Sequence, residues 1–254
     1  MVSTFQPLNR AGGTSMAKLV LPQALGKAAA TQLAARNFPV TLFTSANCQA
    51  PCRDGRELLE KRGIRVDRPT PIDFSQAVQT PDWKQDTMFG CMPPRDVLLT
   101  VGHEILEATM SYRSRWFEYL VYRPLLEQYF KEDPDFRWEA APKPRLTDRL
   151  YKLGFWDMVD NQSEEEQIEL YTMKKQWAIT EEEPVFDAAD IGRFGKDLFV
   201  QRSTCTNASG MSWLRRHFPN HRIHEVLFKE AHPMHIDATF IPLRPGLAIS
   251  NRQR

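Results

Sequence analysis

Three segments of this sequence share one pattern, and that pattern constrains the fold more than any other feature. Residues 96–108, 187–200 and 235–250 each begin near an aspartate and place two apolar runs around a glycine-containing turn. This arrangement is typical of a β-hairpin. Apolar residues at helical spacing follow the first two segments, at 116–126 and 209–217. Repeated units of one kind favour a propeller or another repeat architecture, and a mixed α/β sandwich is the simpler alternative.

Other local signals add shorter elements to this expected repeat. Asp54 is a suitable N-cap for a short helix over 55–62. Strands are expected at 64–66 and 226–228. Pro124 lies inside the helical pattern of the first repeat, so a kink or a break is expected there.

The charged residues are distributed unevenly along the chain. Lys and Arg total 33 and Asp and Glu total 32, a balance that argues against a nucleic-acid partner. The first acidic residue is Asp54, and five basic residues precede it. An acid-free, positively charged segment matches the composition of a mitochondrial transit peptide, with a disordered tail as the alternative. We therefore expect a targeting segment at 1–53, a folded domain at 54–254 and a mitochondrial location, with the cytoplasm as the second choice.

The aspartates of the three hairpins are Asp96, Asp187 and Asp237. In a closed ring of repeats, equivalent strand ends meet at the axis. Three carboxylates directed into one cavity repel one another unless a cation lies between them. That cation is either a metal ion or an organic group such as a guanidinium, which carboxylates bind through paired hydrogen bonds.

Histidine and cysteine patterns bear on the metal alternative. Five of the six histidines fall between His217 and His235. In a strand, His235 and Asp237 share one face, so a single His–Asp pair is expected in a site without a metal. The four cysteines contain no CxxC pair, which argues against a disulfide scaffold and against a zinc site built on thiolates.

Several longer motifs resemble a known family. These are Met92-Pro-Pro-Arg-Asp96, Arg113-Ser-Arg-Trp-Phe-Glu-Tyr119, Ala141-Pro-Lys-Pro144, Phe186-Asp-Ala-Ala-Asp190 and Pro233-Met-His-Ile-Asp-Ala-Thr-Phe240. In this order they closely resemble the glycine amidinotransferases, over residues 57–254. The resemblance implies a pentein-type fold, which is a five-bladed α/β propeller of ββαβ modules around an axial site. The chain is expected to hold an incomplete form of it, truncated at both ends.

The resemblance also implies a reaction that needs no cofactor. Members of this family transfer the amidino group of arginine to glycine, giving guanidinoacetate and ornithine on the way to creatine, and some relatives use other amines. The group passes through a cysteine in a Gly-rich segment near the family's C-terminus. None of Cys48, Cys52, Cys91 and Cys205 aligns with it. A non-catalytic arginine-binding or regulatory protein is therefore the alternative function.

Five site residues follow from the matched motifs. Asp96 and Asp237 correspond to the carboxylates that hold the substrate guanidinium. His235 corresponds to the general acid/base, and Asp187 to the carboxylate that orients it. Arg254 corresponds to the arginine that binds the substrate carboxylate. The expected partners are arginine and glycine; a homodimer is compatible with the resemblance, and association with a membrane surface is left open.

Overall fold

The computed structural model describes residues 57–70, 72–91, 94–244 and 246–251. Its first complete repeat is a three-stranded sheet with one helix. β3 (Leu98–Val101) and β4 (Glu104–Glu107) form an antiparallel hairpin. The chain continues into α3 (Arg123–Glu132) and returns as β5 (Arg137–Ala140), which pairs in parallel with β4. The order is therefore ββαβ.

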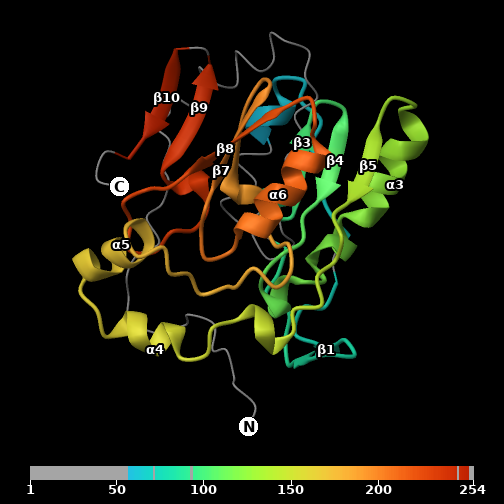
Figure 1. Ribbon diagram of the computed structural model, residues 1–254. Helices are drawn as coiled ribbons and strands as arrows, with labels where there is room; N and C mark the ends of the chain where they lie inside the picture. Colours follow the sequence, from blue (N-terminus) through green and yellow to red (C-terminus); the bar gives the residue numbers. More distant parts are fainter. Residues whose placement is uncertain (1–56, 71, 92–93, 245, 252–254) are drawn as a thin grey trace.

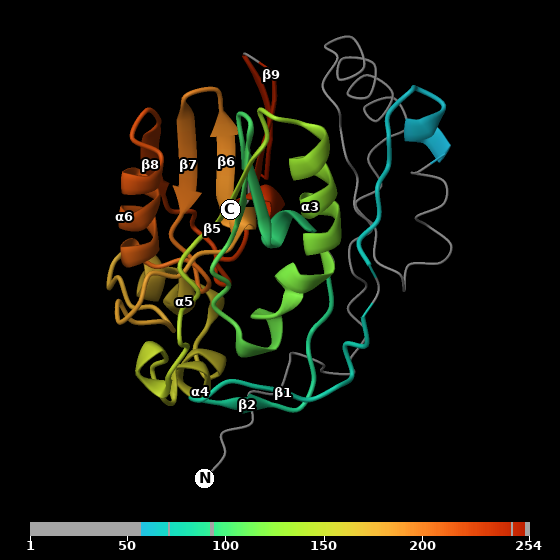
Figure 2. The same cartoon turned by 90° about the vertical axis from the view of Figure 1, so that its right-hand side faces the viewer.

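A second repeat has the same topology (Figure 1). β6 (Ile191–Phe194) and β7 (Asp197–Gln201) are antiparallel. After α6 (Ala208–His217), β8 (Arg222–Val226) pairs in parallel with β7. In the rotated view, α6 lies beside the β6–β7–β8 sheet and α3 lies on the other side of the molecule (Figure 2). Two ββαβ modules thus occur in succession.

A third hairpin follows the second module. β9 (Phe240–Arg244) and β10 (Leu247–Ser250) pair with each other, and Gly246 in the turn between them has a φ of 77°. A β-branched or bulky residue rarely adopts that angle, whereas glycine does so readily. The expected hairpin over 235–250 is confirmed for its strands.

A short 3₁₀ turn precedes the first strand of each repeat. The three turns are η1 (Pro94–Asp96), η5 (Ala188–Asp190) and η6 (Ile236–Ala238). η5 contacts both η1 and η6, so equivalent ends of the three repeats meet in one place. The convergence inferred from the repeated pattern is therefore present, and it places acidic residues from distant parts of the chain side by side.

The remaining described elements connect these repeats. α5 (Glu164–Thr172) carries a capping box, in which the Ser163 hydroxyl accepts from the backbone N–H of Glu166 while the Glu166 carboxylate accepts from the backbone N–H of Ser163. The elements are β1 (Val78–Gln79), β2 (Lys84–Gln85), η2 (Arg113–Arg115), η3 (Glu118–Val121), η4 (Asp148–Leu150), α4 (Phe155–Asp160) and α5 (Glu164–Thr172).

Both three-stranded sheets contribute to one hydrophobic core. Leu106 of the first sheet and Leu198 and Val200 of the second are almost completely buried in the same cluster. Met211 and Leu214 on α6 bury their side chains in it, which accounts for the apolar spacing seen at 209–217. The two modules therefore pack as one unit and fix the 3₁₀ turns between them.

Three local expectations differ from the structure. Residues 64–66 pair with no strand in the described part of the chain and run as an irregular segment. Of the expected helix over 55–62, the structure describes 57–60 as helical. β8 ends at Val226, so the strand expected at 226–228 lies earlier. The break expected at Pro124 is confirmed: Pro124 occupies the first turn of α3, where its missing N–H has no helical partner to lose, and α3 is separate from η3.

No helix among the described residues is both long and apolar enough to cross a lipid bilayer.

Lys143 is a partly buried cation in the loop after β5. Its Nζ donates to the carbonyl of Ala108 at 3.0 Å and lies 4.1 Å from the ring centroid of Tyr119. Burial lowers the pKa of Lys143 to about 8. A lysine in the unfolded chain has its ordinary pKa of 10.5, so the unfolded state binds more protons between these two values. The free energy of unfolding contributed by Lys143 therefore rises with pH across this window.

We expect Lys143→Met to remove this pH dependence. We compare the free energy of unfolding of the parent with that of the variant. The difference, parent minus variant, should increase by about 1.5 kcal/mol when the pH is raised from about 8 to about 9.5. Urea unfolding at several pH values measures it, and Lys174→Met at an exposed ion pair with Glu169 is the control. A parent–variant difference that stays constant over this range would show that Lys143 is solvated.

Candidate functional site

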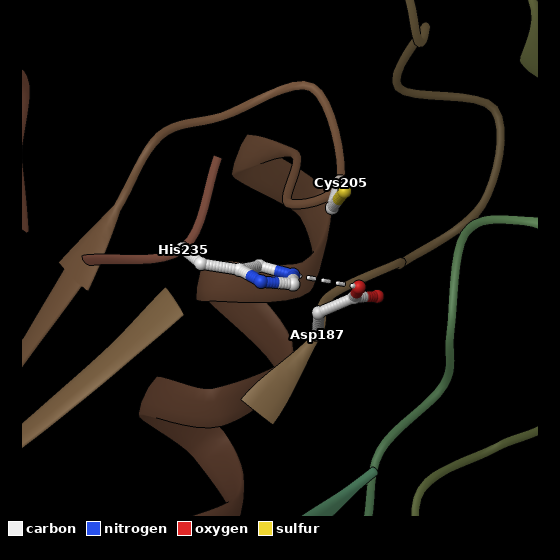
Figure 3. A group of neighbouring side chains, drawn as sticks. All are labelled: Asp187, Cys205 and His235. Carbon is white, nitrogen blue, oxygen red and sulfur yellow. Dashed lines mark hydrogen bonds and ion pairs between the residues drawn. The ribbon is translucent and has the colours of Figure 1, made fainter. Parts of the chain in front are cut away.

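Asp96, Asp187 and His235 come together where the 3₁₀ turns meet. His235 Nε2 lies 3.3 Å from Asp187 Oδ2, and His235 Nδ1 lies 3.8 Å from Asp96 Oδ1 (Figure 3 shows the first contact). Both aspartates are buried, whereas the His235 side chain is 19% exposed. The imidazole therefore has a carboxylate near each ring nitrogen and keeps one path to solvent.

Each aspartate retains an oxygen without a hydrogen-bond partner. Asp96 Oδ1 and Asp187 Oδ1 are both buried, and neither accepts a hydrogen bond from any described residue. A buried acceptor left unsatisfied costs about 1–3 kcal/mol, so such atoms are rare in folded proteins. Two of them in one cluster point to a ligand that supplies N–H or O–H donors, or to a cation.

A buried arginine partly neutralises this cluster. Arg115 donates to both oxygens of Glu118, at 2.8 Å and 3.0 Å, and its Nη1 donates to Asp96 Oδ2 at 2.9 Å. The same Nη1 lies 3.8 Å from Asp187 Oδ2. Burial raises the pKa of Glu118 to about 7, although Arg115 opposes this shift. One guanidinium thus serves three buried carboxylates.

Asp190 fixes the backbone of His235. It is buried and accepts from the hydroxyls of Ser203 and Thr206, at 2.5 Å and 2.6 Å. Its other oxygen accepts from the backbone N–H of His235 at 2.8 Å. His235 has a φ of 60° and a ψ of 101°, a conformation that costs a non-glycine residue about 1–3 kcal/mol. The bond from Asp190 therefore helps to hold a strained residue in the site.

The electrostatic surroundings shift two pKa values in the same direction. Burial alone lowers the pKa of His235, but the hydrogen bond and charge of Asp187, with two further carboxylates, raise it above its ordinary value. Burial raises the pKa of Asp190 to about 6, and His235 opposes the shift. A histidine whose protonated form is favoured can donate a proton near neutral pH, which is the property of a general acid.

A thiol also borders the site. Cys205 is fully buried in the loop before α6, and its sulfur lies close to the side chains of Asp187 and His235 (Figure 3). Burial and the charges of Asp187 and Asp190 raise the pKa of the Cys205 thiol well above its ordinary value. The thiol is therefore neutral in this state, and a neutral thiol is a weak nucleophile.

One of the sequence-derived site residues, Asp237, lies elsewhere. The carboxylate of Asp237 pairs with Arg95, and both line a cavity of about 550 Å³. Asp96, Asp187 and His235 do not line that cavity. The expected side-chain pair of His235 with Asp237 is wrong, because residues 236–238 form a 3₁₀ turn and the alternation of a strand does not apply. Arg254 lies outside the described residues.

The structure adds four residues that sequence reasoning did not assign. Arg115, Glu118 and Asp190 lie within motifs that match the family, but nothing in their spacing shows that they are buried together. Cys205 had no signal beyond its residue type. The other described histidines near the C-terminal end are spread out; for example, His224 Nε2 pairs with Asp197 at 2.7 Å and His217 pairs with Glu104.

Comparisons with known proteins place this arrangement in context. No protein-family model matches the chain. The mitochondrial glycine amidinotransferase of Danio rerio is 46% identical over 198 residues, which are 78% of this chain and 45% of that protein. This chain is a homologue of the glycine amidinotransferases. It spans about half the length of the curated relatives it matches.

Solved structures agree with this homology. An amidinotransferase of the saxitoxin biosynthetic pathway from Microseira wollei superposes with a TM-score of 0.70 at 38% identity, covering 80% of this chain and 54% of that one. The inosamine-phosphate amidinotransferase of Streptomyces griseus gives 0.65 at 38% identity, covering 80% and 52%. This amidinotransferase homologue therefore has the pentein-type α/β fold, of which the described residues show two ββαβ modules and the hairpin of a third.

Proposed function

We propose that the chain carries the guanidinium-binding and proton-donating part of an amidinotransferase that uses arginine as donor and glycine as acceptor. The products are ornithine and guanidinoacetate, a precursor of creatine. One observation carries this proposal: Asp96 and Asp187 each present a buried, unsatisfied oxygen beside His235. The homology to glycine amidinotransferases supports the same assignment.

A guanidinium suits these oxygens for physical reasons. It is planar and always charged, and it offers several N–H donors in fixed directions. Bound beside Asp96 and Asp187, it would satisfy both Oδ1 atoms and add positive charge where Arg115 serves three buried carboxylates. Charge-assisted hydrogen bonds of this kind are about twice as strong as neutral ones.

His235 has the position and charge for the proton step. Breaking a C–N bond of the guanidinium releases an amine that needs a proton, and His235 can supply it. Asp187 orients the imidazole and favours its protonated form. The carbon of the amidino group passes to the thiolate of a cysteine and then to the acceptor amine. The proposal assigns that cysteine to no residue of this chain, since Cys205 does not align with it.

The acceptor, the location and the remaining residues belong to the same proposal. Relatives are named for different acceptors, glycine in one and an inosamine phosphate in another, and the described residues contain no feature that selects between them.

The relatives' names and the acid-free segment 1–53 favour a mitochondrial location, with 54–254 as the folded domain. Asp237 and Arg254 are proposed to contact the substrate.

Calorimetric titration with arginine tests the binding step. We expect arginine to bind, and ornithine to bind at least about tenfold more weakly because it has no guanidinium. Asp96→Asn and Asp187→Asn should each weaken the binding of arginine by at least about tenfold. Asp197→Asn, at an exposed ion pair, is the control. Thermal melting of each variant checks that it folds. Equal affinity for arginine and ornithine, or unchanged affinity in both folded variants, would overturn the assignment.

Intact-mass measurement after incubation with arginine separates binding from covalent transfer. We expect no adduct on this chain, because the Cys205 thiol is neutral and buried. An amidino adduct on Cys205 would contradict two statements: that Cys205 does not align with the family's cysteine, and that its thiol is neutral and unreactive.

A further inference from the structure

We propose that Asp187, Cys205 and His235 form a binding site for one soft divalent cation, for which zinc is the best-fitting ion. Within the described residues, this is the group of three metal-ligating side chains whose donor atoms lie close together. The three residues come from different parts of the second and third repeats, as Figure 3 shows. The binding proposal stands on this geometry and does not depend on the proposed function.

The distances fit a small ion after a modest movement. One ligand atom from each residue lies within 4.8 Å of the other two. Two nitrogen or oxygen ligands of a tetrahedral zinc ion, each about 2.1 Å from it, are about 3.4 Å apart. His235 Nε2 and Asp187 Oδ2 are already 3.3 Å apart. A Zn–S bond is about 2.3 Å long, so the ligand spacing at sulfur is only slightly larger. The sulfur of Cys205 therefore needs to approach these atoms by at most about an ångström.

An independent observation also favours a cation at this point. Asp187 is fully buried, and its Oδ1 has no hydrogen-bond partner in the described part of the chain. Nearby, Asp96, Asp190 and Glu118 are buried as well; Arg115 pairs with Asp96 and Glu118, and Arg95 adds a second positive charge near Asp96 and Asp190. Buried charge is costly unless it is compensated, so a divalent ion would relieve the excess of negative charge.

The chemistry of the three donors selects the kind of ion. A thiolate, an imidazole and a carboxylate together suit zinc, whereas magnesium and calcium prefer oxygen ligands alone. Three protein ligands leave the fourth position of zinc for water or another small molecule, and the partial exposure of His235 gives access. On binding, the Cys205 S–H bond breaks, a Zn–S bond forms and one proton leaves to solvent. His235 binds through a ring lone pair, so a protonated imidazole also releases its ring proton to solvent on binding.

Zinc at this position and a substrate guanidinium exclude each other, because both need Asp187 and His235. This consequence rests on the proposed function; the binding itself does not. Zinc would act on the chain as a competitor of arginine. The ion would also connect the loop before α6 to the turn that carries His235, and so stabilise the fold by linkage.

The test uses the full chain with Cys48→Ser and Cys52→Ser in every sample, so that thiols outside the described residues do not bind the ion. Zinc is titrated against a chromophoric chelator, and cobalt is added separately to record the thiolate-to-metal charge-transfer absorption. We expect one zinc per chain, release of protons from Cys205 and His235 on binding, and a higher melting temperature with zinc. We also expect the charge-transfer band with cobalt.

Matched variants assign the ligands. Cys205→Ser should abolish the charge-transfer band and lower the affinity for zinc by at least about a hundredfold. His235→Gln should lower the affinity for zinc by a similar factor. Cys91→Ser, at a second buried thiol, and His224→Gln should change neither. His235 is partly exposed, so its variant serves where Cys205→Ser does not fold. Absence of zinc binding by the folded parent, or equal binding in the folded His235 variant, would overturn the proposal whatever the result with arginine.

Discussion

Replacing Arg115 by methionine is expected to lower the free energy of unfolding by about 3–5 kcal/mol, because it leaves Glu118 and Asp96 buried without their positive partner. The arginine is 7% exposed and contacts both carboxylates at hydrogen-bond distance. Net stability is typically about 5–15 kcal/mol, so the variant approaches the limit of folding. Urea unfolding followed by circular dichroism measures the change.

A double variant separates lost charge pairing from lost packing. Arg115→Met combined with Glu118→Gln removes one unpaired charge and should recover part of the stability. Arg149→Met is the surface control; its partner is Glu182 at 2.8 Å, its side chain is 73% exposed, and the expected change is below about 1 kcal/mol. A double variant no more stable than Arg115→Met would show that the arginine stabilises by packing.

The second large loss of stability is expected on replacing Asn207, whose side chain joins α6 to the segment that leads into the site. Its Oδ1 accepts from the backbone N–H groups of Val185 and Gly210, and its Nδ2 donates to the carbonyls of Thr180 and Glu183. Asn207→Ala leaves these four backbone groups unpaired, and each buried one costs about 1–3 kcal/mol. We expect the free energy of unfolding to fall by about 3 kcal/mol or more, measured by thermal and urea unfolding.

Two further variants define the origin of this loss. Asn207→Asp keeps both acceptor contacts and loses the two donors, so its stability should lie between those of the parent and the alanine variant. Ser163→Ala removes an exposed cap from α5 and should cost only about 1 kcal/mol. A similar cost for Asn207→Ala and Ser163→Ala would mean that Asn207 acts as an ordinary helix cap.

The repeated hairpins could be predicted from the sequence because the signals involved are local. Two apolar runs around a glycine at the turn are sufficient to indicate strands such as β3 and β4. The positions of β8 and of the segment 64–66 were predicted less well, because short strands depend on a pairing partner that composition does not reveal. The ββαβ order came from family resemblance, and the structure confirms it for two modules.

The site was predictable only in part, for a related reason. Asp96, Asp187 and His235 were identified from motifs, and the structure places them together. Arg115 and Asp190 were not, because their importance lies in burial and in contacts with distant residues. The pairing of His235 with Asp237 failed since it assumed a strand, whereas the backbone there has a positive φ and a 3₁₀ turn.

His235 reaches the site from η6, which leads into the hairpin of β9 and β10, and within the described residues this sheet has only those two strands. Asp96 and Asp187 belong to the three-stranded modules around the shared core. Local unfolding requires least free energy where few strands pair, so amide protons of β9 and β10 should exchange fastest among the strands of the three repeats. His235, the proposed acid/base group, can therefore detach from the site while the two carboxylates stay in place, and any ligand that contacts all three residues would slow exchange in this hairpin.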